Sequence, residues 1–386
     1  MRTYLPYGRQ SINQDDIDAV VAVLRSDWLT QGPMVEQFEQ AVADYCGVKY
    51  AIAASNATAA LHLACLAIGL GSGDRLWTSP NTFVASANCA RYCGADVDFV
   101  DIDAQTYNLS VPALEQKLIQ AAQFNTLPKV LLPVHFSGQS CDMKSIALLA
   151  KKYGIQIIED ASHALGGSYR SQKIGSCQFS EMAVFSFHPV KMITTGEGGM
   201  IVTDRLDLYE KLKQFRSHGI VQSPDTILKD NPDPWYYEQQ VLGYNYRLTD
   251  IQAALGISQL QRLDQFVARR QGIFDRYQEK LQDLPIQHPI VLSQSSHHLY
   301  VIRLKLEKMN RSKREVFSLL REQGIGVQIH YIPVHTQPYY RQLGFDWGDF
   351  PESESYYHET ISLPIHYDLS ETEHNRIIQT LREVIL

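Results

Sequence analysis

Between residues 48 and 204, short apolar runs alternate with helical stretches. Runs such as KVLLPVHF (129–136), IQIIEDASH (155–163) and GGMIVTD (198–204) are continuously apolar and rich in β-branched residues. Strands of this kind are typical of sheets that are covered on both faces, and the intervening helices supply that cover. The pattern therefore predicts an α/β fold built on a mostly parallel sheet.

Three further segments flank this region. Residues 13–29 predict an amphipathic helix, because apolar residues recur at helical spacing behind a capping Asn13: Ile17, Val20, Val21 and Leu24. Three prolines and several charges predict a long surface loop over residues 223–240. Residues 249–281 predict one long helix with a buried stripe of Ile251, Leu255, Leu260 and Leu263.

The rest of the chain predicts a compact α+β unit. It should contain a strand, a helix, a second strand and a final helix, at 298–306, 312–324, 325–335 and after 370. A capping box formed by Ser370 and Glu373 opens that final helix. We expect a large cofactor-binding domain with an N-terminal arm over residues 1–262, and a small C-terminal domain over residues 263–386.

Composition excludes several classes of function. The chain carries 35 lysines and arginines against 42 aspartates and glutamates, without a basic block, so nucleic acid is not an expected partner. No apolar stretch approaches the ~20 residues of a membrane span, and the N-terminus lacks a secretion signal. We expect a cytoplasmic protein without a membrane partner. The six cysteines form no CxxC pair, and no metal site is expected.

The first candidate for chemistry is the segment from Ser55 to Ala59 (SNATA), where a strand gives way to a helix. Ligands of open α/β sheets bind beyond the carboxyl ends of the strands. Small residues there let a phosphate approach the free N–H groups of the helix start, where the dipole also favours an anion. On its own, this motif is better explained as an ordinary helix cap.

The second candidate is the pair Asp160 and His163, which follows another apolar strand. A buried carboxylate is costly without a cationic partner, and a protonated pyridine nitrogen is one such partner. Asp160 would keep that nitrogen protonated, so that the ring can accept electrons. Taken alone, Asp160 is equally well explained as a loop cap or as half of an ion pair.

The third candidate is Lys191, which lies among apolar neighbours and precedes a glycine-rich turn. A lysine held against apolar surface can lose its proton and attack an aldehyde. Pro189 fixes the approach of the chain, and Ser186 is close enough to bind the same phosphate. None of the three motifs is decisive alone. Together, on one sheet, they meet the demands of pyridoxal 5'-phosphate (PLP): an anion cradle, a pyridinium partner and an imine-forming amine.

These residues resemble the DegT/DnrJ/EryC1/StrS family of sugar-nucleotide aminotransferases. The resemblance covers nearly the whole chain and is most specific at EDASHALG (159–166), SFHPVKMITTGEGG (186–199) and GYNYRLTDIQAALG (243–256). It implies an aspartate-aminotransferase-like fold, fold type I of the PLP enzymes. It also implies that the cofactor is PLP and that the protein is an aminotransferase.

The resemblance assigns roles around the cofactor. Lys191 is similar to the Schiff-base lysine, Asp160 to the partner of the pyridine nitrogen, and His163 to the residue that bonds the phenolic oxygen. Phe83 is similar to the aromatic residue that stacks on the ring, although a plain core position would also explain it. The phosphate contacts would come from Thr58, Ala59 and Ser186.

Other roles concern the substrates and a second subunit. Asn245 resembles the residue that reaches the phosphate from the neighbouring subunit, which implies a homodimer with shared active sites. Six residues match segments that line the sugar-nucleotide site: Tyr7, Leu29, Thr30, Gln328, His330 and Tyr331. Two explanations stay open for Arg247, since it could bind the carboxylate of the amino donor or pair with Asp250.

The family resemblance implies amino transfer from L-glutamate to a 4-keto-6-deoxy nucleotide sugar. The wording of SFHPVK and HYIPVH is most similar to members that act in pseudaminic acid biosynthesis, which implies a UDP-linked sugar. Sugars of the perosamine, viosamine or 4-amino-arabinose type remain alternatives. Relatives that dehydrate sugars replace the Schiff-base lysine with histidine, so Lys191 favours transamination. A non-catalytic, cofactor-holding regulator is the remaining alternative.

Overall fold

A seven-stranded sheet forms the centre of the computed structural model, which describes residues 4–223 and 227–386. The strand order is β1-β9-β8-β5-β4-β2-β3, and only β9 runs antiparallel to its neighbours. The predicted, mostly parallel sheet is therefore confirmed. The strands are β1 (Tyr50–Ala54), β2 (Arg75–Thr78), β3 (Asp96–Phe99), β4 (Val130–Leu132), β5 (Gln156–Asp160), β8 (Met182–Ser186) and β9 (Gly199–Thr203).

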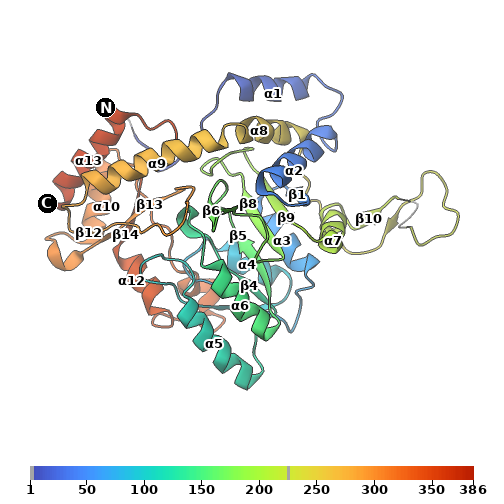
Figure 1. The fold of residues 1–386 in the computed structure, drawn as a ribbon, viewed down its shortest axis with the longest axis horizontal. Coiled ribbons are helices and arrows are strands. Elements are labelled where there is room, and N and C mark those ends of the chain that lie inside the picture. The colour runs from blue at the N-terminus through green and yellow to red at the C-terminus, as the bar shows by residue number, and fades with distance from the viewer. Residues whose placement is uncertain (1–3, 224–226) are drawn as a thin grey trace.

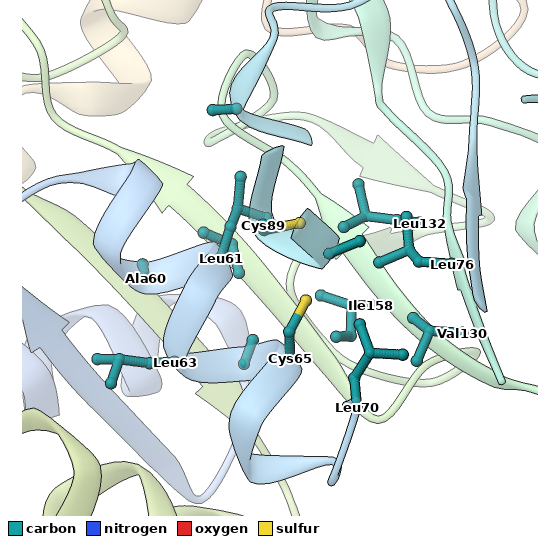
Figure 2. Packing of buried hydrophobic residues seen from close by; sticks show 14 of the residues in the cluster. Ala60, Leu61, Leu63, Cys65, Leu70, Leu76, Cys89, Val130, Leu132 and Ile158 are labelled. Atoms are coloured by element: carbon teal, nitrogen blue, oxygen red, sulfur yellow. The ribbon is translucent and has the colours of Figure 1, made fainter. Parts of the chain in front are cut away.

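Helices cover both faces of this sheet. One face carries α3 (Ala57–Ala67), α4 (Ala85–Tyr92) and α7 (Leu206–Arg216). The other carries α2 (Pro33–Cys46), α5 (Val111–Phe124), α6 (Met143–Tyr153) and α8 (Asp250–Leu260). Figure 2 shows the packing on the first face, where Leu61 and Cys65 of α3 lie near Ile158 of β5. Burial on both faces explains why the strands are apolar without alternation.

The C-terminal part has its own small antiparallel sheet of β12 (Ile286–Gln287), β13 (Tyr300–Leu304) and β14 (Thr360–Leu363). Three helices pack against it: α9 (Leu263–Lys280), α10 (Lys313–Glu322) and α13 (Glu371–Ile385). The capping box of Ser370 and Glu373 is present. The first strand and both helices predicted here are confirmed. Short elements complete the chain: β6 (Ser168–Tyr169), β7 (Gln172–Lys173), α11 (Pro338–Arg341) and α12 (Pro351–Glu359).

The strand predicted over 325–335 is wrong. This segment makes only isolated bridges, one of them between Gln328 and Ser362. Val327 is buried in the C-terminal core, whereas Val334 is buried in the core of the large sheet. The segment therefore crosses from one core to the other, and its apolar residues are buried in two different cores instead of forming one strand.

The N-terminal helix is confirmed as α1 (Gln14–Leu24) with its Asn13 cap, but it ends before the predicted residue 29, and two of the four apolar residues at helical spacing face solvent. Ile17 and Leu24 are exposed, while Asp16 is buried. The Asp16 carboxylate accepts hydrogen bonds of 2.7 Å from Ser258 and Gln259 of α8 and pairs with Arg262. Polar contacts therefore hold α1 on α8, and part of its apolar surface faces outward.

Two more predictions need correction. The helix predicted over 249–281 is interrupted after Leu260, so α8 and α9 are separate helices that run one after the other (Figure 1). In α8 the buried residues include Ala253, Ala254 and Gly256, while the predicted Ile251, Leu255 and Leu260 are partly exposed and only Leu263 of the stripe is buried. Small residues are buried because α2 lies very close. The predicted boundary at 262/263 falls at the interruption and stays a prediction.

The predicted loop over 223–240 is described from residue 227 onward and at residue 223, while residues 224–226 lie outside the described residues. Its end forms β11 (Glu238–Gln239), which pairs with β10 (Ile220–Val221). Figure 1 shows this hairpin extending away from the rest of the molecule. Among the described residues, no helix combines the length and apolar character needed to cross a bilayer.

The contact of α2 with α8 gives a test of the packing. A Cβ atom at Gly256 would lie 2.5–2.8 Å from the Phe38 ring, whereas one at Gly272 of α9 would meet nothing within 4 Å. We expect Gly256→Ala to destabilise the protein by about 1–3 kcal/mol through overpacking. Gly272→Ala should stabilise it by roughly 0.5–1 kcal/mol, because alanine has the higher helix propensity. Urea unfolding measures both, and equal stability of the two variants would contradict this account.

Candidate active site

A cavity of about 800 Å³ opens where β5 and β8 end and α3 begins. Most of the predicted site residues line it: Tyr7, Thr58, Phe83, Asp160, His163, Ser186, Lys191, Gln328, His330 and Tyr331. They come from the carboxyl ends of the strands, from the start of α3 and from the crossing segment 325–335. The sheet edge predicted to bind a ligand is therefore the edge where these residues meet.

The start of α3 forms one wall of the cavity. The Asn56 side chain caps the helix by accepting a 2.8 Å bond from the Ala59 amide. The N–H of Ala59 is therefore already engaged, and Ala59 itself is buried. The amides of Ala57 and Thr58 precede the first intrahelical bond. A Cβ atom at Gly199 would lie 2.6–2.7 Å from the backbone of Asn56 and Ala57. Glycine at 199 thus lets the helix start reach the sheet edge.

Asp160 ends β5 and is buried. Its Oδ1 accepts a 2.6 Å bond from the Ser162 hydroxyl and a 3.1 Å bond from the Ser162 amide, and its Oδ2 accepts a 2.6 Å bond from Ser86. A carboxylate offers about four acceptor positions, so three bonds leave room for one more donor. That donor would approach from the cavity, which Asp160 lines.

Lys191 lies in the same cavity. Burial lowers the pKa of its amine from 10.5 to about 8, although the charge of Asp160 acts in the opposite direction. Burial disfavours the charged ammonium form more than this carboxylate favours it. Near neutral pH a useful fraction of the amine is therefore uncharged and nucleophilic.

His163 is held as one neutral tautomer. Burial, with a smaller effect from Lys191, lowers its pKa well below the usual 6.5. The backbone N–H of Ser137 donates to His163 Nδ1 over 3.3 Å, so Nδ1 carries no proton. The ring proton is therefore on Nε2, which donates to the Tyr331 hydroxyl at 3.0 Å. His163 offers an N–H to the cavity rather than a positive charge.

Aromatic side chains form the opposite wall. Phe83 is 58% exposed yet lines the cavity, so the explanation of Phe83 as a plain core residue is wrong. Tyr7 lies 5.0 Å from the His330 ring, centroid to centroid, and also lines the cavity. Burial lowers the pKa of His330 to about 3, so this imidazole is neutral.

Four predicted residues lie outside this cavity: Ala59, Leu29, Thr30 and Asn245. Leu29, Thr30 and Asn245 are exposed. Thr30 pairs with Thr249, and the Leu29 carbonyl accepts a bond from the Asp250 amide, so residues 29–30 lie beside the segment that carries Asn245. The suggested pairing of Arg247 with Asp250 is wrong: the described residues show no ion pair between them, and the buried Asp250 carboxylate accepts bonds from the amides of Gly32 and Met34.

The sequence interpretation missed several cavity residues, including Ser86, Ser162, Thr82, Glu197 and Gln337. Ser162 stands inside the EDASH motif, and that position was the available signal. Ser86 and Thr82 gave no signal, because hydroxyls next to a helix start are usually caps. Their link to Asp160 depends on how α4 packs against β5.

The arrangement fits PLP on the residues present. The free amides at the α3 start, with Ser186 nearby, suit its phosphate group. Asp160 has one acceptor position left for the ring nitrogen, Phe83 exposes an aromatic face, and Lys191 supplies an amine of lowered pKa.

The chain was compared with known proteins. The DegT/DnrJ/EryC1/StrS aminotransferase family matches residues 10–382. The chain is 38% identical to the spore coat polysaccharide biosynthesis protein SpsC of Bacillus subtilis, over 99% of this chain and 97% of SpsC. It is also 38% identical to the UDP-4-amino-4,6-dideoxy-N-acetyl-β-L-altrosamine transaminase of Campylobacter jejuni, again over 99% and 97% of the two chains.

Among solved structures, Helicobacter pylori PseC, an aminotransferase involved in pseudaminic acid biosynthesis, superimposes with a TM-score of 0.91. The identity is 33%, and the match covers 99% of both chains. This agreement confirms the predicted fold type I architecture. The chain therefore belongs to the DegT/DnrJ/EryC1/StrS aminotransferase family and is a PLP-dependent sugar-nucleotide aminotransferase.

Proposed function

We propose that this enzyme transfers the amino group of L-glutamate to the keto carbon of a UDP-linked 4-keto-6-deoxy sugar, as in pseudaminic acid biosynthesis. The observation that carries the amino-transfer chemistry is the Lys191 amine, with its lowered pKa, in one cavity with the Asp160 carboxylate. The similarity to the altrosamine transaminase and to PseC supports the sugar. SpsC, which is named for spore coat polysaccharide biosynthesis, is equally similar, so another nucleotide-linked 4-keto sugar is the second candidate.

Each residue has a defined task in this proposal. Bound PLP supplies the electron sink that stabilises charge at the donor's α-carbon. Lys191 would hold the cofactor covalently through Nζ, and the neutral Nζ would also be the base for the α-proton of the donor. Asp160 would face the ring nitrogen, and the Nε2–H of His163, which contacts the Tyr331 hydroxyl, would donate a hydrogen bond to the phenolic oxygen instead. Thr58 and Ser186 bind the phosphate, and Phe83 stacks on the ring.

The remaining walls of the cavity suit the sugar nucleotide. Tyr7, Gln328, His330 and Tyr331 come from the N-terminal arm and the crossing segment, opposite the sheet edge. Neutral imidazole and phenol groups can bond sugar hydroxyls without attracting a counter-ion. We propose that these four residues, with Leu29 and Thr30, bind the sugar nucleotide.

We further propose a homodimer with shared active sites. Leu29, Thr30 and Asn245 match family site segments but lie together on an exposed surface outside their own cavity. A second copy related by a twofold axis can present this surface to the cavity of the first, and the reverse. Asn245 would then reach the phosphate of the neighbouring subunit.

A substrate panel tests the reaction. The purified enzyme with L-glutamate should convert a UDP-linked 4-keto-6-deoxy sugar into the 4-amino sugar, identified by mass spectrometry and NMR, with parallel initial-rate lines. Preference for a dTDP- or GDP-linked sugar would reject the pseudaminic acid assignment and keep the transamination. A product that has lost a hydroxyl group without gaining nitrogen would identify a dehydratase instead.

Borohydride treatment tests Lys191. The PLP-loaded enzyme should yield a pyridoxyl group on the peptide that contains Lys191, and Lys191→Ala should yield none. Because the pKa of the amine is lowered to about 8, the rate of PLP capture by the apoenzyme should rise through pH 8, where half of the amine is neutral, and level off about one pH unit above it. The exposed Lys151→Ala variant is the control and should behave like the wild type. A rate that keeps rising toward pH 10 would show a solvated amine.

Complementation tests the shared site. Lys191→Ala and Asn245→Ala homodimers should each have low activity. After mixing and subunit exchange, each hybrid dimer contains one site with both native residues, so about a quarter of wild-type activity should return. If Asn245 acted within its own subunit, mixing would restore nothing.

A further inference from the structure

The bond from Ser86 to Asp160 is part of a longer chain of buried hydroxyl groups. Thr82 Oγ1 and Ser86 Oγ lie 2.7 Å apart, and Ser86 Oγ lies 2.6 Å from Asp160 Oδ2. Thr82 is 2% exposed and Ser86 is fully buried. At these distances both contacts are strong hydrogen bonds in a water-poor environment.

The direction of this chain follows from hydrogen-bond counting. An ionised carboxylate only accepts, so the single hydroxyl proton of Ser86 goes to Asp160. Ser86 Oγ can then only accept from Thr82, and the Thr82 hydroxyl must donate to it. Thr82 therefore donates to Ser86, and Ser86 donates to Asp160. The carboxylate at the end of the chain determines the position of both hydroxyl protons.

Neither hydroxyl serves the more common purpose in a helix. The N-cap of α4 is Val84, and no side-chain cap is formed there. A serine within a helix usually bonds the carbonyl four residues earlier, whereas Ser86 bonds Asp160 of β5, 74 residues away. The two hydroxyls thus link the segment 82–86 to the end of β5.

The same short segment carries Phe83, whose ring is exposed to the cavity. The buried side chains of Thr82 and Ser86 are hydrogen-bonded to each other at the cavity wall, and Phe83, which follows Thr82, exposes its ring there. A chain that fixes residues 82 and 86 against Asp160 also fixes the backbone on which Phe83 stands. The segment 82–86 therefore positions both the Asp160 carboxylate and the Phe83 ring, which would enclose the pyridine ring of the cofactor.

We infer that Thr82 and Ser86 form a positioning relay, which orients Asp160 and Phe83 for the pyridine ring of PLP. Neither residue touches the reacting atoms. Ser86 fixes Oδ2 of Asp160, and Ser162 fixes Oδ1, so the remaining acceptor position of the carboxylate points into the cavity. Thr82 acts only through Ser86. This inference rests on the roles proposed above for Asp160 and Phe83.

The dissociation constant of PLP, measured by titrating the apoenzyme, tests the relay without any substrate. Ser86→Ala should weaken PLP binding about tenfold, as expected for losing a hydrogen bond to a charged group. Thr82→Val, which has nearly the same shape, should weaken it less, by about threefold. Thr82→Ser keeps the hydroxyl and should keep the affinity. In the double variant Thr82→Val/Ser86→Ala, the loss should equal that of Ser86→Ala alone, because the second bond no longer exists.

Thr203→Val is the matched control. Thr203 is equally buried, and its hydroxyl donates a 2.7 Å bond to the Glu181 carbonyl at the other end of β9 from the cavity. It should leave PLP affinity unchanged, and thermal unfolding should show that every variant is folded. Unchanged affinity in Ser86→Ala, or losses that add in the double variant, would overturn the relay. A wild-type enzyme that fails to capture PLP at Lys191 would instead reject the proposed site itself.

Discussion

The burial of one carboxylate, Asp160, shapes the active-site side of this molecule. Withdrawing a charge from water is expensive unless donors surround it, and here hydroxyls from Ser86 and Ser162 do so from two different elements. These bonds tie α4 to the end of β5 and leave one side of the carboxylate facing the cavity. The lowered pKa of Lys191 has the same origin, since both groups occupy a site with little water.

The cavity exists because two cores meet beside it. Residues 325–335 leave the C-terminal core at Val327 and enter the core of the large sheet at Val334. Between these two anchors lie His330 and Tyr331, which face the sheet edge. Burial of apolar residues thus fixes both ends of segment 325–335, while its middle is polar. The segment can therefore present a rigid surface with hydrogen-bonding groups to the cofactor residues.

Close backbone approach is the second constraint. Gly199 allows the start of α3 to contact the sheet, and Gly256 allows α2 to lie against α8. Both glycines belong to motifs that also hold residues with proposed roles, one with Lys191 and the other with Asn245. The motifs therefore combine residues proposed for the site with glycines that bring backbones together.

The sequence alone determined the α/β class, the main strands and helices around the large sheet and the capped helices, and it indicated that Lys191, Asp160 and His163 meet at one edge of the sheet. Strands buried on both faces and helix caps are local patterns, and the carboxyl ends of parallel strands necessarily meet. Only the tertiary structure decided that Ser86 bonds Asp160, that Asp16 holds α1, and that segment 325–335 crosses between cores. These features depend on distances between residues far apart in the chain, which no local pattern encodes.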